Sequence, residues 1–262
     1  MTILDELAGH ARERVEADKR TLSLKDIRRA AGECPAGGGD AFRGALSSEG
    51  LSVICEIKKA SPSKGVIDPV FDYMSVASSY EAAGADALSC LTEPKWFMGS
   101  DEIFKSVRSM VSVPMLRKDF TVDEYQLYQA RLLGADCVLL ICSILDEGRL
   151  GEYLGICRSL GLAALTETHS REEIDMALRC GADIIGINNR DLKDFSVDLS
   201  TSEDLRGYVP KEVLCVAESG VTTPEDASRL RRAGADAVLV GEAMMRSSDR
   251  AGLIKSMKEA SA

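Results

Sequence analysis

Short apolar runs of strand length recur eight times along the chain, and stretches with helical periodicity separate them. The runs are rich in Val, Ile and Leu, as is typical of strands buried on both faces. The predicted strands are 53–58, 86–92, 113–118, 136–141, 162–167, 183–188, 213–218 and 236–241. Helical spacing of apolar residues predicts helices between them, for example at 75–83, 123–133, 149–160, 171–179 and 224–233.

A Gly-Ala-Asp tripeptide occurs four times, beginning at Gly84, Gly134, Gly181 and Gly234, so that the copies lie 50, 47 and 53 residues apart. Each copy follows a helical stretch and precedes a strand. Glycine suits this place because the chain commonly leaves a helix through a left-handed residue. One strand–helix unit is normally shorter than these spacings, so each repeat is expected to contain two units.

Strict alternation of strands and helices favours a parallel sheet with right-handed crossovers. Eight units in about 210 residues match a closed barrel, since such folds take roughly 250 residues in all. An open doubly wound sheet is the alternative, but it usually carries a glycine-rich dinucleotide fingerprint after the first strand. This sequence has none. We therefore expect a single (β/α)8 TIM barrel.

The segment 1–47 is predicted to be a helical extension packed on the barrel, which comprises 48–262. Apolar residues at helical spacing predict a first helix through Ile3, Leu4, Leu7, Ala11 and Val15. A second helix is predicted around Leu24, Ile27 and Ala30, then a glycine-rich loop at 34–39 and a short helix at 40–46. The segment is too short to form a core of its own easily.

The composition restricts the partners and the location. The 262 residues are 45% hydrophobic and 28% charged, which suits one globular domain with a sizeable core. A net charge of −10 argues against nucleic acid or an anionic membrane as a partner, although an anionic small molecule can still bind a local cationic pocket. No signal-peptide core or membrane-spanning apolar run is apparent. Eight scattered cysteines and only two histidines predict reduced thiols, a cytoplasmic location and no metal site.

Charged and polar residues gather where the predicted strands end, which is where barrels place their reactive groups. Glu56 and Lys58 share one face of the first strand, so both charges are expected to point into the barrel. The other strand ends carry Thr92, Glu93, Lys118, Glu167, Asn188, Arg190, Glu218, Ser219, Gly241 and Glu242. A structural alternative is an ion pair such as Glu56–Lys118 that merely plugs the barrel. Several buried charges are costly, however, unless they are paired or used.

The loops after the seventh and eighth predicted strands have the features of a phosphate site. Ser219-Gly220 follows one strand and Gly241-Glu242 the other, where barrels often bind phosphate through backbone N–H groups and a helix N-terminus. Either glycine alone could be a turn residue, whereas the two together favour a phosphate site. The loop 60–65 after the first strand is long and rich in hydroxyl groups, and we expect it to be a mobile flap.

Longer motifs follow one another along the chain. They are Cys55-Glu56-Ile57-Lys58-Lys59-Ala60-Ser61-Pro62-Ser63-Lys64-Gly65, Leu91-Thr92-Glu93 with Phe97 and Gly99-Ser100, Leu116-Arg117-Lys118-Asp119-Phe120, Leu139-Leu140-Ile141, Glu167 with His169, Gly186-Ile187-Asn188-Asn189-Arg190-Asp191-Leu192, and Ala217-Glu218-Ser219-Gly220. Together they closely resemble the motifs of the indole-3-glycerol-phosphate synthase family, from the N-terminal extension to Met245. The small departures are Trp96, Met98, Thr166 and Thr168, the last two flanking Glu167 where aliphatic residues are expected.

The resemblance implies closure of 1-(2-carboxyphenylamino)-1-deoxyribulose 5-phosphate to indole-3-glycerol phosphate, with loss of CO2 and water, in tryptophan biosynthesis. It implies catalytic roles for Glu56, Lys58, Lys118, Glu167, Asn188 and Ser219. It implies substrate contacts for Ser61, Phe97, Phe120, Arg190 and Glu218, and phosphate contacts for Ser61, Gly220, Gly241 and Glu242. No cofactor or metal is expected, because the imine-like intermediate itself drives decarboxylation. A monomer is expected, and association with other tryptophan-pathway enzymes is left open.

The residues suit this chemistry. Condensation onto a carbonyl needs a proton donor at its oxygen, and Lys118 or Lys58 can serve if a cationic mouth lowers the pKa of the lysine or positions it tightly. The loss of water needs a base, for which Glu167 is expected and Glu56 is an alternative or partner.

Binding groups are available as well. The fork of Arg190 suits a carboxylate, Asn188 can bind hydroxyls, and Phe120 offers an apolar wall to an aromatic ring. Three other functions stay open: a Schiff-base aldolase with Lys118 as nucleophile, a phosphoribosylanthranilate isomerase, and a non-catalytic phosphate-binding barrel.

Overall fold

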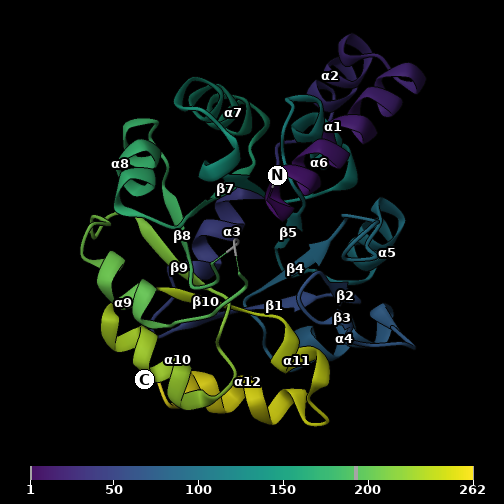
Figure 1. The fold of residues 1–262 in the computed structure, drawn as a ribbon. Coiled ribbons are helices and arrows are strands. Elements are labelled where there is room, and N and C mark those ends of the chain that lie inside the picture. Colours follow the sequence, from purple (N-terminus) through teal and green to yellow (C-terminus); the bar gives the residue numbers. More distant parts are fainter. Residues whose placement is uncertain (1, 192–193, 262) are drawn as a thin grey trace.

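The computed structural model describes residues 2–191 and 194–261, and within them eight parallel strands close into a barrel (Figure 1). The strands are β1 (Ser52–Ile57), β4 (Ala87–Leu91), β5 (Met115–Lys118), β6 (Cys137–Ile141), β7 (Ala163–Thr168), β8 (Ile184–Asn188), β9 (Leu214–Glu218) and β10 (Ala237–Val240). Around the barrel the order is β1-β10-β9-β8-β7-β6-β5-β4, and β4 pairs with β1 again. The predicted (β/α)8 barrel is confirmed. Leu192, the last residue of one sequence motif, lies outside the described residues.

Helices surround the barrel and precede it. The surrounding helices are α4 (Tyr73–Ala82), α5 (Asp101–Met110), α6 (Tyr125–Leu133), α7 (Glu147–Leu160), α8 (Arg171–Arg179), α9 (Ser200–Arg206), α10 (Pro224–Ala233) and α12 (Arg250–Glu259). The N-terminal extension contains α1 (Ile3–Thr21), α2 (Leu24–Gly32) and α3 (Gly39–Leu46). The loops at the carboxyl ends of the strands add η1 (Cys142–Ile144), α11 (Glu242–Arg246) and a hairpin of β2 (Ala60–Ser61) and β3 (Gly65–Val66).

Most predicted strand boundaries differ from the structure by only one or two residues, and two differences have a local reason. The strand predicted from residue 113 begins at Met115, directly after Pro114, which has no N–H group to donate to a neighbouring strand. The loop predicted at 60–65 contains the antiparallel β2–β3 pair, so this connection has regular structure of its own.

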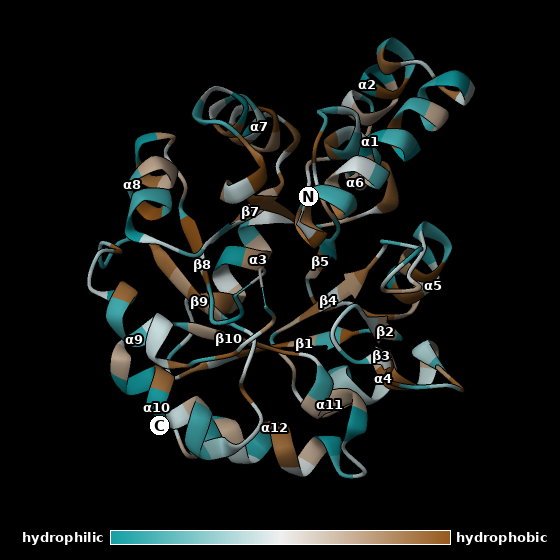
Figure 2. Cartoon of the chain, in the orientation of Figure 1, coloured by the Kyte–Doolittle hydropathy of each residue, from teal (hydrophilic) through white to brown (hydrophobic). Residues whose placement is uncertain are grey.

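Apolar side chains fill both the barrel and the layer between barrel and helices. Figure 2 shows apolar residues concentrated on the strands and polar residues on the outer faces of the helices. Inside the barrel, Ile54, Leu116 and Leu165 belong to one buried cluster, which also contains Phe42 and Leu46 of α3. Helix α3 is visible across the centre of the barrel in Figure 1. It therefore closes the amino end of the barrel from within.

The four repeated glycines end helices as predicted. Gly84, Gly134, Gly181 and Gly234 have φ values of +83°, +81°, +80° and +102°. A side chain is strained in this left-handed region, whereas glycine adopts it at no steric cost. Each repeat thus marks the turn from a helix into the next barrel strand.

The aspartates of the repeats join neighbouring strands at the amino end of the barrel. In three copies the carboxylate accepts a hydrogen bond of 2.7–2.8 Å from the backbone near the start of the preceding strand: Val53 N to Asp86, Met115 N to Asp136 and Cys215 N to Asp236. The fourth aspartate, Asp183, instead forms an ion pair of 3.3 Å with Arg43 of α3. Three of the four repeats therefore have the same structural role.

Candidate active site

A cavity of about 540 Å³ opens at the carboxyl ends of the barrel strands. Every residue that the family resemblance assigned to catalysis or binding lines it: Glu56, Lys58, Ser61, Phe97, Lys118, Phe120, Glu167, Asn188, Arg190, Glu218, Ser219, Gly220, Gly241 and Glu242. They meet here because parallel strands in a barrel present their carboxyl ends at one face. The structure brings the predicted residues together, and their individual roles stay predictions.

Glu56 points into the barrel and is buried, with 4% of its surface exposed. Its partner is Lys58 of the same chain segment, with which it forms a short ion pair. Ile54, two residues earlier, belongs to the interior cluster, as expected for a strand that alternates between two faces. The suggested Glu56–Lys118 plug is not formed, because each of these residues has its ion pair elsewhere.

Lys118 at the end of β5 lies between two carboxylates on the far side of the barrel. Its Nζ donates to Glu218 Oε2 at 2.6 Å and to Glu167 Oε2 at 3.3 Å. Gly186 of β8 makes room for this arrangement, since a Cβ there would collide with Glu218 Oε1. Three neighbouring carboxylates, including Glu56, thus share two ammonium groups at the floor of the cavity.

The pKa values of this cluster are driven apart. Burial acts to lower the pKa of Lys118, but the carboxylates of Glu218 and Glu167 outweigh it and raise the pKa above its ordinary value. Burial, with repulsion from Glu167 and Glu56, raises the pKa of Glu218 to about 7 despite Lys118. Burial also acts to raise the pKa of Glu167, but attraction to Lys118 lowers it overall. Of the two alternatives expected for Lys118, a lowered pKa is therefore wrong, and tight positioning stays a prediction.

The residues that flank Glu167 leave its carboxylate undisturbed. Thr166 and Thr168 are buried on the opposite face of β7, and the hydroxyl of Thr168 donates to Gly186 O at 2.9 Å. His169 Nε2 lies 3.7 Å from Glu167 Oε1. Burial opposes the charge on His169, but the nearby carboxylates of Glu173 and Glu167 raise its pKa. Glu167 is thus placed between Lys118 on one side and His169 on the other.

An aromatic and aliphatic wall forms one side of the cavity. The rings of Phe97 and Phe120 lie 6.2 Å apart, centroid to centroid, and the aliphatic side chains that line the cavity beside them are Leu91, Leu139, Ile141 and Leu239. Thr92 and Glu93 were expected among the groups that point into the mouth. They are buried and do not line the cavity; Glu93 instead binds the backbone of the Phe97 turn.

The loop after β8 brings Asn188 and Arg190 to the cavity. Asn188 Oδ1 accepts from the backbone N–H of Arg190 at 3.0 Å, and the Arg190 guanidinium donates to Phe195 O at 3.1 Å. Between them, the buried Asn189 amide donates to Glu218 O at 3.0 Å and to Ser219 O at 3.1 Å. Neither Asn189 nor Phe195 was assigned a role from the sequence. A polar residue next to a strand end was the available signal for Asn189.

The expected phosphate residues follow the neighbouring strands β1, β10 and β9, and so line one corner of the cavity. Ser219 and Gly220 both have positive φ, +64° and +87°, so the backbone turns sharply after β9. Gly241 has no space for a side chain, because a Cβ would lie 2.7 Å from Lys58 Nζ. The Glu242 carboxylate is 4.0 Å from Lys64 Nζ of the β2–β3 hairpin. Backbone N–H groups and two lysines therefore border this corner.

Helix α1 completes the cavity, which the sequence did not predict. Ile3, Leu4 and Leu7 line it from the N-terminal extension. The apolar periodicity of this segment was visible, but apolar residues on one face of a helix are expected for ordinary packing as well. Only the folded chain distinguishes the two roles.

The described residues were also compared with the requirements of a metal site, a membrane-spanning helix and a disulfide. No group of three or more His, Cys, Asp or Glu side chains in 2–191 and 194–261 is arranged to hold a metal ion. No helix in these ranges is long and apolar enough to cross a membrane. All eight cysteines are free; Cys34 and Cys180 are half-buried and the others buried.

Comparison with known proteins places the chain among relatives of similar length. A profile of the family described as indole-3-glycerol phosphate synthase matches residues 4–257. The chain is 50% identical to the protein of that name from Ruminiclostridium cellulolyticum, over 94% of this chain and 95% of the relative. It is 45% identical to the one from Lachnoclostridium phytofermentans, over 98% of both chains.

Among solved structures, a thiamine phosphate pyrophosphorylase from Pyrococcus furiosus has the same type of fold. The TM-score is 0.61 at 19% identity, covering 84% of this chain and 96% of that one. Identity at this level supports the barrel fold alone. The family profile and the two bacterial relatives, by contrast, match nearly the whole sequence at high identity. The chain belongs to the indole-3-glycerol phosphate synthase family.

Proposed function

We propose that this cavity closes 1-(2-carboxyphenylamino)-1-deoxyribulose 5-phosphate to indole-3-glycerol phosphate, releasing CO2 and water. One observation carries the assignment: Lys118 is held between Glu167 and Glu218 at the floor of a cavity with an aromatic wall on one side. The reaction joins an aromatic carbon to a carbonyl carbon, so it needs a proton donor at the carbonyl oxygen and a surface for the ring.

Lys118 is the proton donor of the ring-closing step in this proposal. Its raised pKa keeps it an ammonium ion, which can donate a proton to the carbonyl oxygen as the aromatic carbon attacks. Loss of CO2 then returns the electron pair of the broken C–C bond to the cationic imine-like intermediate, so no separate electron acceptor is needed. Tight positioning, rather than a lowered pKa, makes Lys118 effective.

Glu167 is the base of the dehydration. Its lowered pKa keeps it ionised, as a proton acceptor must be, and it lies close enough to Lys118 to exchange a proton with it. Lys58, paired with Glu56, is the second donor and can protonate the departing hydroxyl. Glu218 has the opposite character to Glu167, since its raised pKa favours a proton near neutrality. Environments that separate the pKa values of neighbouring carboxyl groups are typical of acid–base sites.

The two ends of the substrate have different environments. The aromatic ring lies against Phe97 and Phe120, and Arg190 takes its carboxylate through the planar fork of its guanidinium group. The phosphate occupies the corner formed by Ser61, Gly220 and Gly241, where backbone N–H groups can donate to its oxygens. Glu242 takes part through its backbone, because its carboxylate repels an anion.

The alternative functions use the same residues less well. A Schiff-base aldolase needs a neutral lysine as nucleophile, whereas two carboxylates hold Lys118 as an ammonium ion. An isomerase needs one acid–base pair and leaves Glu56 and Lys58 without a task. A non-catalytic barrel leaves the buried cluster of five charged groups unexplained, because such groups are costly to bury.

The deciding experiment adds the carboxyphenylamino-deoxyribulose phosphate to the purified protein and follows indole absorbance and fluorescence. We expect indole-3-glycerol phosphate to form without any added metal or cofactor, and borohydride to trap no covalent adduct. The absence of this product, or a borohydride-trapped adduct on Lys118, would exclude the proposal. Size-exclusion chromatography of the same sample tests the expected monomer. A cytoplasmic location is part of the proposal and is supported by the eight free cysteines.

A further inference from the structure

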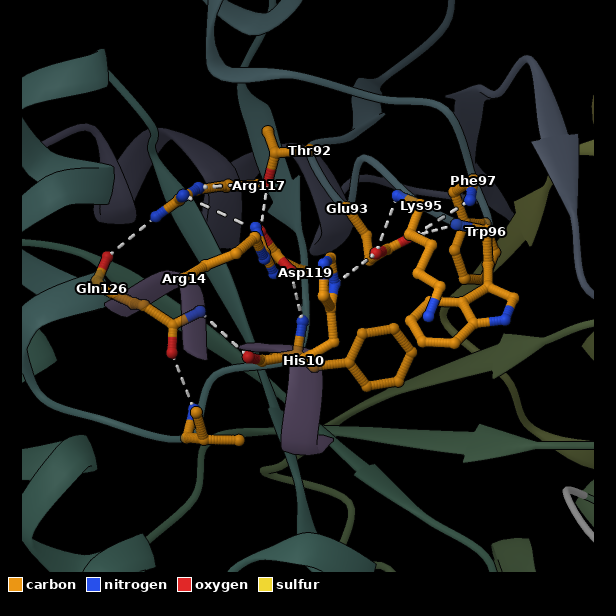
Figure 3. A network of polar contacts seen from close by, with 12 residues as sticks. His10, Arg14, Thr92, Glu93, Lys95, Trp96, Phe97, Arg117, Asp119 and Gln126 are labelled. Atoms are coloured by element: carbon orange, nitrogen blue, oxygen red, sulfur yellow. Dashed lines mark hydrogen bonds and ion pairs between the residues drawn. The ribbon is translucent and has the colours of Figure 1, made fainter. Parts of the chain in front are cut away.

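One face of helix α1 continues past the cavity toward the ends of two barrel strands. Leu7 lines the cavity, and His10 and Arg14 follow at spacings of three and four residues, so the three side chains share a face. His10 reaches Glu93 after β4, and Arg14 reaches Asp119 after β5 (Figure 3). Both carboxylates are buried, with 0% and 3% of their surface exposed.

Glu93 joins His10 to the turn that carries Phe97. Its Oε1 accepts from His10 Nδ1 at 3.2 Å and from Lys95 N at 3.0 Å. Its Oε2 accepts from the backbone N–H groups of Trp96 at 2.7 Å and Phe97 at 3.0 Å. The His10 ring also meets the Trp96 indole edge-on, with centroids 5.4 Å apart. The position of Phe97 therefore depends on a carboxylate that α1 holds in place.

Asp119 makes a parallel connection from Arg14 to Phe120. Its Oδ1 accepts from Arg14 at 2.6 Å and from the backbone N–H of Phe120 at 2.8 Å. Its Oδ2 accepts from Arg14 at 3.1 Å and from the hydroxyl of Thr92 at 2.7 Å. Asp119 directly follows Lys118, so the same contacts also fix the backbone at the end of β5. Each of these two side chains of α1 is thus one carboxylate away from one ring of the aromatic wall.

We propose that His10 and Arg14 are positioning residues of the ring closure, which hold Phe97 and Phe120 in place through Glu93 and Asp119. This inference rests on the proposed function. Without His10, Glu93 keeps only its backbone donors, and without Arg14, Asp119 keeps Thr92, Phe120 N and Arg117 at 3.8 Å. A buried carboxylate that loses one donor shifts toward those that remain, because a lost hydrogen bond to a buried charge is costly. The turn it binds then moves with it. A displacement of about 1 Å between reacting groups can reduce a rate about 100-fold.

Helix α1 is also attached to the barrel independently of these two residues. Val15 packs with Tyr125 and Tyr128, Ala11 packs with Val122, and Lys19 forms an ion pair of 2.8 Å with Asp123. Removing His10 should therefore leave α1 docked. An effect of His10 on the reaction can then be separated from loss of the helix.

The first test compares His10→Ala and Arg14→Lys with Arg12→Ala, a substitution on the exposed face of α1. Two inhibitors serve as probes: anthranilate (2-aminobenzoate), which has the aromatic half of the substrate, and inorganic phosphate. We expect kcat/KM to fall about 10- to 100-fold and anthranilate inhibition to weaken in the first two variants. Inhibition by phosphate should stay within twofold of wild type, and Arg12→Ala should resemble wild type throughout. Equal losses for both inhibitors, or no loss of kcat/KM, would overturn the proposal.

The second test asks whether His10 acts through Phe97. If it does, the double variant His10→Ala/Phe97→Leu should lose about as much kcat/KM as the poorer of the two single variants. Residues that act independently would instead give losses that add in free energy. His10→Gln, which keeps a donor for Glu93, should recover most of the activity. Additive losses, or a Gln variant as poor as Ala, would reject a positioning role.

Trp96 provides a spectroscopic readout, since it is the single tryptophan of the chain and contacts His10. Without any ligand, the fluorescence emission of Trp96 should already differ between wild type and His10→Ala. The emission of Arg12→Ala should match that of wild type. Identical emission in all three would also overturn the inference. Failure of the proposed function is distinguishable, because wild-type protein would then form no indole-3-glycerol phosphate at all.

Discussion

The ammonium group of Lys118 lies 2.6 Å from the carboxylate of Glu218, across the barrel from the strand that carries it. The two residues are 100 positions apart in the sequence, on β5 and β9, and both are buried or nearly so. Charge at the floor of the cavity is therefore shared between strands that lie opposite each other in the barrel.

Lys118→Met should reduce ring closure about 10²- to 10⁴-fold, the usual effect of losing a general acid. The fold should persist, because Glu218 can take up a proton when its cationic partner is gone. The measurements are indole formation and the circular dichroism spectrum, with Lys211→Met on the surface as the matched control. Activity within threefold of wild type in a folded Lys118→Met protein would remove this lysine from the mechanism.

Glu167→Gln should lower kcat by roughly 100-fold or more and change KM little. Glutamine keeps the shape and one oxygen for Lys118 but cannot accept a proton, so a proton-transfer step is lost while binding survives. Steady-state kinetics of Glu167→Gln and Glu56→Gln, measured side by side, test this. If Glu56→Gln shows the loss of kcat and Glu167→Gln only a raised KM, the roles of the two carboxylates must be exchanged.

Substrate affinity should decrease as the pH rises past about 7, where Glu218 loses its proton. Ionisation adds a negative charge to a cavity that must accept a carboxylate and a phosphate. Glu218→Gln should show a flatter dependence of kcat/KM on pH between 6 and 8, roughly one pH unit to either side of neutrality. A pH profile identical to wild type in that variant would assign the titration to another group.

The same shift has a consequence for stability with a defined sign. The folded protein binds the Glu218 proton more tightly than the unfolded chain does, since the folded pKa is about 7 and the ordinary value is 4.5. This contribution is complete below 4.5 and is lost as the pH rises to about 7. Urea unfolding of wild type and Glu218→Gln should therefore diverge across this window, by at most about 1.4 kcal/mol per pH unit. Parallel curves would contradict it.

Glu242→Gln should strengthen inhibition by inorganic phosphate about two- to fivefold, since a carboxylate at the rim of the phosphate corner repels the anion and exposed charge effects are modest. Ser61→Ala should weaken the same inhibition, because it removes a hydroxyl donor. Gly241 is a poor choice for this test, because any side chain there collides with Glu56 and Lys58. Inhibition constants that change in the same direction in both variants would mean that the phosphate lies elsewhere.

Asp136→Ala should lower the free energy of unfolding by about 1–3 kcal/mol, because it leaves the buried N–H of Met115 without its acceptor. Asp183→Ala is the matched control from the repeat whose aspartate has only the ion pair with Arg43, and should cost less than about 1 kcal/mol. Urea denaturation of both variants measures the difference. Equal losses would mean that the hydrogen bond to the strand start is not what makes these aspartates stabilising.

The barrel was predictable because its signals are local. An apolar run, a glycine at a helix end and regular spacing lie within a few residues of each other, and strand ends follow directly from them. The pairing within the site was not predictable in this way. Lys118 meets Glu218 and Glu167 because the curvature of the closed sheet brings β5, β7 and β9 together. The three residues are separated by 100 and 49 positions in the sequence, so no local pattern predicts these contacts.

The contribution of α1 was hidden for a related reason. His10 contacts Glu93 across 83 residues, and Arg14 contacts Asp119 across 105. Taken by themselves, His10 and Arg14 look like polar residues on an amphipathic surface helix, which commonly face solvent. Only their contacts with the buried side chains of Glu93 and Asp119 reveal their link to the strand ends.

Helix α3 determines the route by which substrate enters and products leave this enzyme. Because Phe42 and Leu46 fill the amino end of the barrel, the cavity has a closed floor. Substrate, CO2, water and product must then share the opening at the carboxyl ends of the strands, where Leu4 of α1, Lys64 of the hairpin and Phe195 of the loop after β8 line the cavity. Product has to leave before another substrate can enter, so the segments around that opening govern release as much as they govern binding.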